Sequence, residues 1–189
     1  MYRKAFIASC VAAFLGVGAA SAIASQTSET YGIGRSPAAA EIEAWDIDVS
    51  PDGTGLPPGS GTVSAGARLY AEKCAACHGP TGSEGPYETL VGTESLSDQI
   101  KAGKRPKRTI GNLWPSAPVL FDYIGRTMPF NEPGSLNTAE IYSVVAWLLH
   151  QNGVLPDATE TVDAAILTSV KMPGAGIFGE DPRRPWLLR

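Results

Sequence analysis

The clearest amphipathic pattern in the chain lies between residues 136 and 153. Asn137 is followed three residues later by Glu140, a pairing in which each side chain caps the other's backbone at the start of a helix. Apolar side chains then recur at helical spacing, at Ile141, Val144, Val145 and Leu148. Gly153 supplies a stop signal. The pattern predicts a helix with one buried face.

A second helical pattern runs over residues 63–77, with Ser64 as the expected N-cap. Gly66 falls inside it, where a glycine costs about 1 kcal/mol relative to alanine. We therefore expect the helix that begins after Asn137 to cross close to Gly66. A third, shorter helix is expected over residues 119–127, directly after a proline.

Residues 25–60 have little apolar periodicity and are rich in Gly, Pro and Ser. Ser36 followed by a proline predicts a short helix over residues 38–44. Residues 45–49 alternate apolar and acidic side chains, which is typical of an extended segment with one buried face. The stretch is either a solvated linker or an arm that lies on the rest of the chain or on a partner, and Trp45 favours docking.

Residues 1–24 have the features of a secretory signal, namely two early cations, an apolar stretch and small residues at its end. The stretch is too short and too rich in alanine and glycine to favour a membrane span. Residues 7–10 weakly resemble a lipoprotein cleavage box, but cleavage there would leave most of the apolar run on the mature protein. We expect no stable membrane span after processing.

Length and composition indicate one modest globular domain with flanking segments, because the chain has 189 residues with 43% hydrophobic and 18% charged content. The net charge of −4 makes nucleic acid an unexpected partner. Against this acidic background five cations gather between residues 101 and 108. Such a run is usually a solvated face; otherwise it meets anionic groups of a cofactor or steers an acidic redox partner.

One motif carries the chemistry: Cys74, Cys77 and His78 in a Cys-x-x-Cys-His arrangement. On a helix the two thiols share a face, so both can form thioethers to a porphyrin while the histidine becomes the proximal iron ligand. A tetrahedral zinc site needs four ligands, and the chain offers only Cys10 and His150 besides. A redox dithiol would need a βαβ surround that is absent from the pattern. The motif therefore predicts covalent attachment of a c-type haem.

The loop over residues 79–92 must cover the proximal side of that haem, and the carbonyl of Pro86 is a candidate to hold the other ring nitrogen of the histidine. After signal removal Met128 and Met172 remain as possible thioether ligands. His150, in the last turn of the final helix, suits the helix dipole and is otherwise a further candidate.

Helix, Cys-x-x-Cys-His, loop, Met-Pro and closing helix together resemble a class I cytochrome c over residues 62–153. Further segments, at 34–59, 121–124 and 128–130, are similar to the cytochrome subunit of periplasmic Sox sulfur dehydrogenases, which is SoxD-like. In that family the cytochrome accompanies a molybdenum-cofactor subunit. Longer members carry a second haem domain, whereas this chain has a single Cys-x-x-Cys-His.

The resemblance implies an all-α fold with one class I cytochrome c domain, an extended N-terminal arm and a C-terminal tail. The expected organisation is a signal peptide (1–24), an arm (25–60), the cytochrome domain (61–153) and a tail (154–189). It also implies one covalent haem c on Cys74 and Cys77, with His78 and Met128 as axial ligands.

The function implied is an electron-transfer subunit in the periplasm rather than a catalyst on its own. Its expected donor is a molybdenum-containing sulfur or sulfite dehydrogenase, and its expected acceptor is another cytochrome or an oxidase. Two alternatives stay open: a generic soluble carrier, against which the arm argues, and a haem enzyme or gas sensor with an exchangeable sixth ligand.

Overall fold

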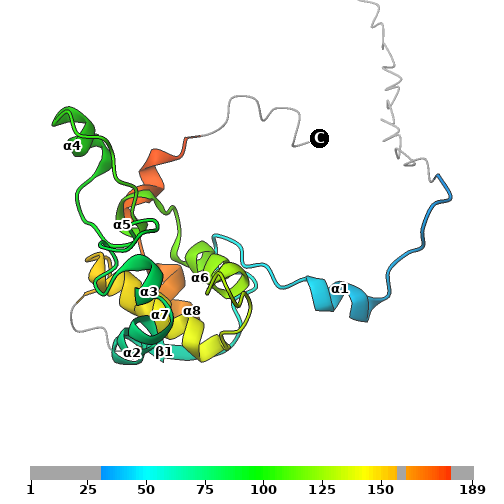
Figure 1. The fold of residues 1–189 in the computed structure, drawn as a ribbon. Helices are drawn as coiled ribbons and strands as arrows, with labels where there is room; N and C mark the ends of the chain where they lie inside the picture. Colours follow the sequence, from blue (N-terminus) through cyan, green and yellow to red (C-terminus); the bar gives the residue numbers. More distant parts are fainter. Residues whose placement is uncertain (1–30, 157–160, 180–189) are drawn as a thin grey trace, which may run out of the picture. The chain divides into compact units, whose positions relative to one another are not determined.

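The computed structural model describes residues 31–156 and 161–179, so the expected signal peptide, Cys10 and the last ten residues lie outside the described part. The chain divides into two units at Ala38 and Ala39, and Figure 1 shows the helices of the second unit. The helices of the second unit are α1 (Ala39–Trp45), α2 (Val63–Lys73), α3 (Ala75–His78), α4 (Leu96–Lys101), α5 (Ile110–Leu113), α6 (Ala117–Thr127), α7 (Thr138–Gln151), α8 (Ala164–Ser169) and the 3-10 helix η1 (Pro173–Ile177).

Two three-residue strands, β1 (Ser60–Thr62) and β2 (Thr161–Asp163), pair antiparallel, with Gly61 opposite Val162. The expectation of an all-α class is confirmed, although this small ladder was not predicted. Within the described ranges, no helix combines the length and the apolar character that crossing a bilayer requires.

Helix α7 is the centre of the second unit, and every residue from Ile141 to Leu149 is buried. Its predicted start is confirmed: Glu140 N–H donates to the Asn137 side chain at 3.0 Å, and Asn137 N–H donates to the Glu140 carboxylate at 2.8 Å. Its end is confirmed too, because Gly153 follows with φ +67°. Helices α2, α6 and both strands pack against α7.

Helix α2 crosses α7 at Gly66, as expected. A Cβ at Gly66 would overlap the Ser143 carbonyl oxygen and come within 2.8 Å of the Trp147 Cβ. One turn further on, the Tyr70 ring stacks on the Trp147 indole, with ring centroids 3.9 Å apart. The absence of a side chain at Gly66 lets the two backbones approach and lets the aromatic rings stack beside the crossing.

The expected N-cap Ser64 is wrong. Thr62 caps α2, and its hydroxyl oxygen accepts the Ala65 N–H at 3.1 Å. Thr62 is the last residue of β1, whose pairing holds it in the extended conformation that a cap requires, whereas Ser64 already lies inside the helix.

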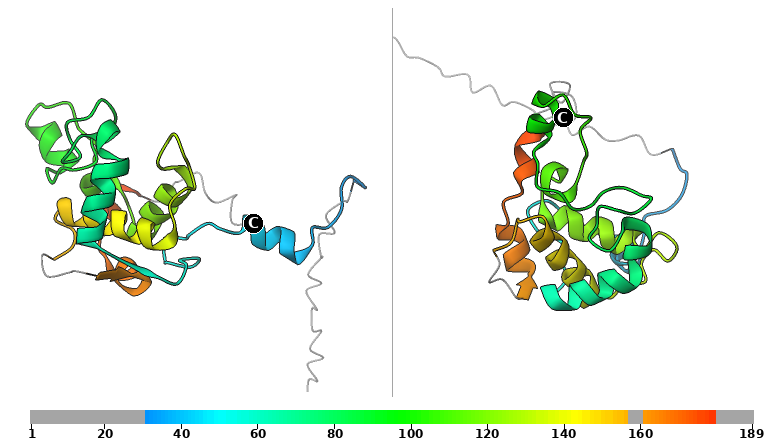
Figure 2. Two further views of the ribbon diagram at one scale, coloured as in Figure 1. Left: turned by 60° about the horizontal axis from the view of Figure 1, so that its bottom comes forward. Right: turned by 60° about the vertical axis from the view of Figure 1, so that its left-hand side comes forward.

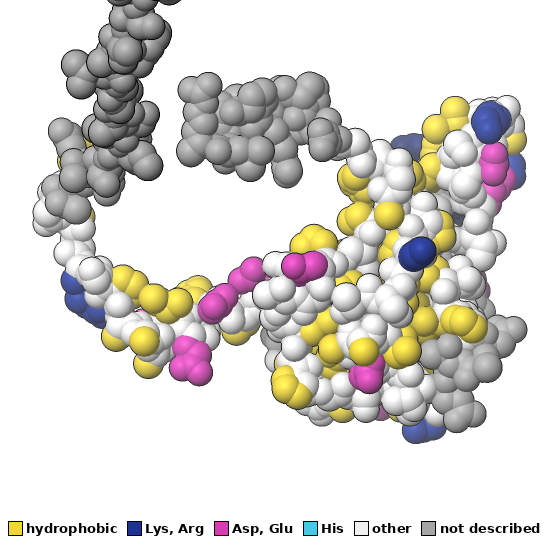
Figure 3. Space-filling view, turned by 180° about the vertical axis from the view of Figure 1, so that it is seen from behind, with side chains coloured by type: hydrophobic (Ala, Val, Ile, Leu, Met, Phe, Trp, Pro, Cys, Tyr) yellow, Lys and Arg dark blue, Asp and Glu magenta, His cyan; other side chains and the backbone are white. Residues whose placement is uncertain are grey.

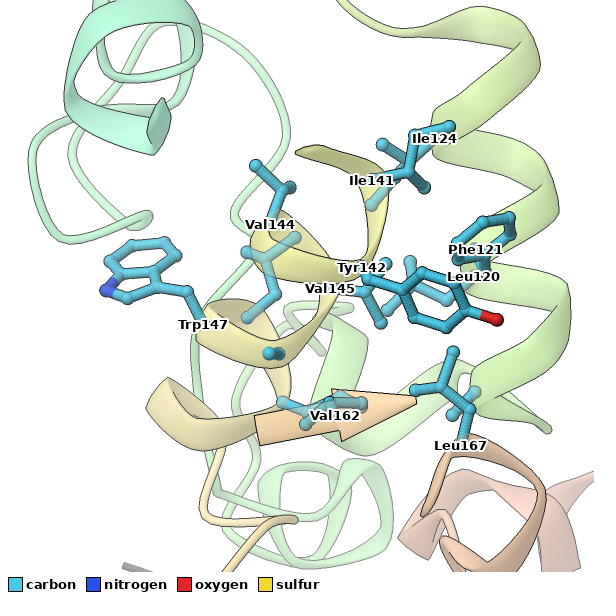
Figure 4. Close-up of a cluster of buried hydrophobic side chains, with 14 of the residues drawn as sticks. Leu120, Phe121, Ile124, Ile141, Tyr142, Val144, Val145, Trp147, Val162 and Leu167 are labelled. Atoms are coloured by element: carbon cyan, nitrogen blue, oxygen red, sulfur yellow. The ribbon is translucent and has the colours of Figure 1, made fainter. Parts of the chain in front are cut away.

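The core continues from α7 to α6 and to the C-terminal segment (Figure 4). Phe121 on α6 contacts Tyr142 on α7, with ring centroids 4.6 Å apart. Val162 on β2 and Leu167 on α8 are fully buried, and Met172 is 4% exposed. Figure 2 shows this orange segment beside the yellow α7. Residues 161–174, which the sequence analysis assigned to the tail, thus contribute buried side chains to the core.

The arm has two different halves. Val49 is buried, and its N–H donates to Asp122 Oδ1 on α6 at 3.0 Å. Further along, the Tyr142 hydroxyl donates to the Pro57 carbonyl at 2.9 Å, so residues 49–57 lie against α6 and α7. Upstream the expectation of a buried face is wrong, because Trp45, the last residue of α1, is 85% exposed.

Gly66→Ala tests the helix crossing. The added methyl group overlaps the α7 backbone, which cannot rotate away, so we expect the free energy of unfolding to fall by about 3 kcal/mol. Denaturant titration of the haem-loaded protein measures the change. Gly176→Ala is the control, because a Cβ there meets no heavy atom within 4 Å, and its expected effect is below about 0.5 kcal/mol. Equal effects at both sites would contradict the close crossing.

Candidate haem site

The Cys-x-x-Cys-His motif lies where α2 gives way to the single turn of α3. Cys74 separates the two helices, and its N–H still donates to the Tyr70 carbonyl at 2.9 Å. Its own carbonyl accepts the N–H groups of Cys77 at 3.1 Å and of His78 at 3.0 Å. Cys74, Cys77 and His78 therefore all lie on one helical turn. Cys74 is half-buried and Cys77 is exposed.

The thiols fit haem attachment better than the alternatives. Burial raises the pKa of Cys74 to about 11, whereas a redox Cys-x-x-Cys needs a thiol with a lowered pKa. Zinc is also disfavoured: in residues 31–156 and 161–179, no three side chains of the types that bind metals are grouped to hold an ion. The two cysteines with the adjacent histidine match the donor set of a c-type haem.

His78 is oriented by a hydrogen bond from its Nδ1 to the Glu88 carbonyl, 2.9 Å away. This contact fixes the ring and leaves Nε2 with a lone pair for iron. The expectation that Pro86 supplies this carbonyl is wrong. The Tyr87 N–H donates to the Cys77 carbonyl at 3.2 Å, and that bond turns the loop so that the next carbonyl, from Glu88, faces the imidazole.

The loop that follows the motif packs directly on the motif's backbone. Gly79, with φ +85°, ends α3, and its carbonyl accepts the Tyr70 hydroxyl at 3.0 Å. A Cβ at Gly85 would come within 2.6 Å of the Gly79 nitrogen and would overlap the Cys77 carbonyl. Only glycine permits this approach, so the loop and the Cys-x-x-Cys-His turn are one backbone unit.

A carboxylate closes the turn after the motif. Glu84 accepts the N–H groups of Thr81 at 3.1 Å and of Ser83 at 3.3 Å, together with the Thr81 hydroxyl. These donors, the Thr81 hydroxyl first, lower the pKa of Glu84 to about 2. The carboxylate therefore stays ionised, and keeps this turn closed, down to strongly acidic pH.

Asn152 ties the loop to the rest of the fold. Its Oδ1 accepts the N–H groups of Gly92 at 3.0 Å and of Gly111 at 3.1 Å, while its Nδ2 donates to Leu90 at 3.2 Å and Leu148 at 2.8 Å. The residue is only 4% exposed, and all four hydrogen-bonding positions of its amide are used. Sequence analysis missed it. The position of Asn152 directly before Gly153 indicates the end of a helix, but it does not indicate which distant residues the side chain bonds to.

Met128 ends α6, where its N–H donates to the Ile124 carbonyl at 3.0 Å. It lies on a different element from the Cys-x-x-Cys-His turn, yet Met128 and Cys74 are both half-buried against the same hydrophobic core. The other thioether candidate, Met172, lies within that core. His150 is in the last turn of α7, as expected, and its Nδ1 is buried without a hydrogen-bond partner.

Comparison with known proteins shows similarity to a cytochrome family and to proteins described as dehydrogenases of sulfur compounds. The profile of a family described as cytochrome c oxidase, cbb3-type, subunit III matches residues 61–148, which contain the motif and Met128. A thiosulfate dehydrogenase from Psychrobacter arcticus is 31% identical over 114 residues. That match covers 54% of this chain and 31% of the relative, so the chain spans about a third of the relative's length.

The fold is similar to a solved structure as well. A chain in the crystal structure of the sulfane dehydrogenase SoxCD from Paracoccus pantotrophus matches with a TM-score of 0.70 and 38% sequence identity. The match covers 84% of this chain and 77% of that one. The similarity extends beyond the region between β1 and α7 into the flanking segments.

Asn152→Ala tests the tie between loop and core. The variant leaves the buried Gly111 N–H and the half-buried Gly92 N–H without their acceptor and removes one donor from the Leu90 carbonyl, so we expect the free energy of unfolding to fall by about 3 kcal/mol. Hydrogen exchange of the Gly92 and Gly111 amides should accelerate in parallel. Asn131→Ala, at an exposed position, is the control and should change stability by less than about 0.5 kcal/mol. Unchanged exchange at both glycines would contradict the assignment.

Proposed function

The chain belongs to the class I c-type cytochromes, and we propose that it carries one covalent haem c and transfers single electrons from a molybdenum-containing sulfur or sulfite dehydrogenase subunit to the respiratory chain. The observation that carries this proposal is the one-turn helix that presents Cys74, Cys77 and His78 together, with the imidazole held by the Glu88 carbonyl. The single Cys-x-x-Cys-His supports one haem.

A bound haem supplies a one-electron iron couple. In this proposal His78 Nε2 and the Met128 thioether would both hold the haem iron, and iron held by two protein side chains would favour electron transfer over chemistry on a bound substrate. The buried position of Met172 supports Met128 as the second ligand. The chain's own contribution is rigidity, because the Glu88 carbonyl and the Asn152 amide hold the proximal side in place.

The proposed donor is supported by the two relatives, one described as a thiosulfate dehydrogenase and the other as a sulfane dehydrogenase. Residues 1–24, proposed as a signal peptide, would place the protein in the periplasm. The upstream half of the arm supports a fixed partner: Ile42 and Trp45 are exposed on α1 among acidic residues. An isolated helix of seven residues is marginal in water, so a partner surface would stabilise it.

Met128→Leu and Met172→Leu form a matched pair, because each removes a thioether and nearly conserves volume. In Met128→Leu the reduced protein should bind carbon monoxide and its reduction potential should fall, since a methionine ligand raises the potential. Met172→Leu should change neither property. The opposite result would transfer the ligand role to Met172. Carbon monoxide binding by the reduced wild-type protein would instead favour an enzyme or a sensor.

The donor is tested by using the haem-loaded protein as bait for the periplasmic fraction of its host. We expect the eluate to contain molybdenum in stoichiometric amount, and sulfite or thiosulfate-derived sulfur to reduce the haem. The double variant Ile42→Ala, Trp45→Ala should lose the molybdenum while its haem spectrum stays that of the wild type. A bait that retains no molybdenum and that no sulfur compound reduces would leave a generic carrier.

A further inference from the structure

Residues 94–108 connect the loop that follows the Cys-x-x-Cys-His motif to α5 and include α4. We term this segment the basic loop. Two buried amides define its shape. Gln99 Nε2 donates to the Glu94 carbonyl at 3.0 Å and to the Lys107 carbonyl at 3.3 Å, while its Oε1 accepts the Lys107 N–H at 2.7 Å. Asn112 Nδ2 donates to the same two carbonyls, each at 3.0 Å.

Glu94 and Lys107 lie at the two ends of the loop, so these hydrogen bonds hold the two ends close together. Further contacts stiffen its tip: Ser95 caps α4 by accepting the Asp98 N–H at 3.1 Å, and Lys104 pairs with the Glu94 carboxylate at 2.8 Å. A surface loop that only connects two elements does not need buried amides to fix its conformation. The basic loop is therefore a defined surface rather than a flexible connection.

The basic loop presents cations around an apolar centre. Ile100 on α4 is 61% exposed. The cations are all exposed: Lys101, Lys104, Arg105, Lys107 and Arg108. The loop also contains two acidic residues, Glu94 and Asp98, which pair with Lys104 at 2.8 Å and Lys101 at 3.5 Å. Five cations and two acids leave residues 94–108 with a net charge of +3, and Arg105 and Arg108 are in the part of the loop that contains no acid. Figure 1 shows α4 projecting beyond α5 and α3, and Figure 3 shows dark blue side chains at the corresponding end of the molecule.

This positive patch stands out because the chain as a whole carries a net charge of −4. The opposite local sign orients an approaching acidic protein toward the loop and repels it elsewhere, which raises the rate of productive encounter. An exposed apolar side chain surrounded by charged ones also has the layout of a protein interface, with a dehydrated centre and a polar rim.

We propose that the basic loop is the docking surface for an acidic redox protein that exchanges electrons with this cytochrome, with Ile100 at the centre of the contact and the cations at its rim. This inference rests on the proposed electron-transfer function and adds the chemistry of a partner to it. An anionic membrane fits the same cations less well. Polybasic membrane binding needs no fixed loop shape, and the acidic remainder of the chain is repelled by anionic lipid.

The test uses the haem-loaded full chain and soluble cytochrome b5, an acidic redox protein, as the probe. The variant is Arg105→Glu, Arg108→Glu. The control, Arg68→Glu, Lys171→Glu, makes the same change in net charge at exposed positions on α2 and before η1. Stopped-flow absorbance measures the second-order rate of electron exchange from low to high salt. Ile100→Ala is a third variant, which leaves every charge in place.

At low salt we expect the loop variant to exchange electrons about tenfold more slowly than the wild type and to lose most of the salt dependence. The control should stay within about twofold of the wild type. Ile100→Ala should weaken binding and keep the salt dependence, because the contact shrinks while the steering charge remains. Equal slowing in loop variant and control would overturn the inference, since net charge alone would then explain it.

The same variants test two other binding partners for the basic loop, namely a second copy of this chain and an anionic membrane. Self-association of the wild type in sedimentation, lost in the loop variant, would assign the loop to a second copy of this chain and overturn the proposal. Loop-dependent binding to phosphatidylserine vesicles, with an unchanged rate toward cytochrome b5, would assign it to a membrane and also overturn it.

Backbone amide shifts on titration with cytochrome b5 separate this inference from the proposed function. Shifts confined to residues 94–108 with no electron exchange would contradict the proposed function and support the docking surface. Electron exchange without shifts in those residues would support the function and overturn the docking surface.

Discussion

The close crossing of α2 and α7 at Gly66 is the constraint on which the rest of the site depends. The missing side chain allows the Ser143 carbonyl to meet the α2 backbone, and the crossing fixes the position of Tyr70, one turn along, against Trp147. From there the Tyr70 hydroxyl donates to the Gly79 carbonyl at the end of the Cys-x-x-Cys-His turn. A change in the crossing would therefore reach the motif along the backbone of α2, where the Tyr70 carbonyl accepts the Cys74 N–H, and through the Tyr70 ring and hydroxyl.

A second line of support reaches the proximal side from the other end of α7. Asn152 bonds to Leu90 and Gly92, so the loop that carries the Glu88 carbonyl is held at its far end by the same helix that α2 crosses. The imidazole of His78 is thus positioned by main-chain groups, whose positions depend on buried contacts with α7. Positioning by backbone carbonyls is insensitive to side-chain motion, which suits a site that must change little between two oxidation states.

Local signals in the sequence predicted the parts of this arrangement that local physics controls. The capping box at Asn137 and Glu140 marks the start of α7, and the cost of a glycine at Gly66 indicates the crossing. The features that the sequence did not predict depend on pairing between segments far apart in the chain. Thr62 replaces Ser64 as the cap because β1 pairs with a strand about a hundred residues away. Strands of three residues are too short to show a periodic pattern, so the sequence could not predict that pairing.

The two surfaces proposed here as docking sites, on α1 and on the basic loop, differ in the sign of their charge. The arm helix α1 shows Ile42 and Trp45 among acidic residues, whereas the basic loop shows Ile100 among cations. An acidic partner is attracted by one surface and repelled by the other, and a basic partner behaves in the opposite way. An electron relay needs a donor and an acceptor that do not compete for one contact. In the proposed function, surfaces of opposite charge would provide that separation, because each partner's own charge would direct it to a different part of the chain.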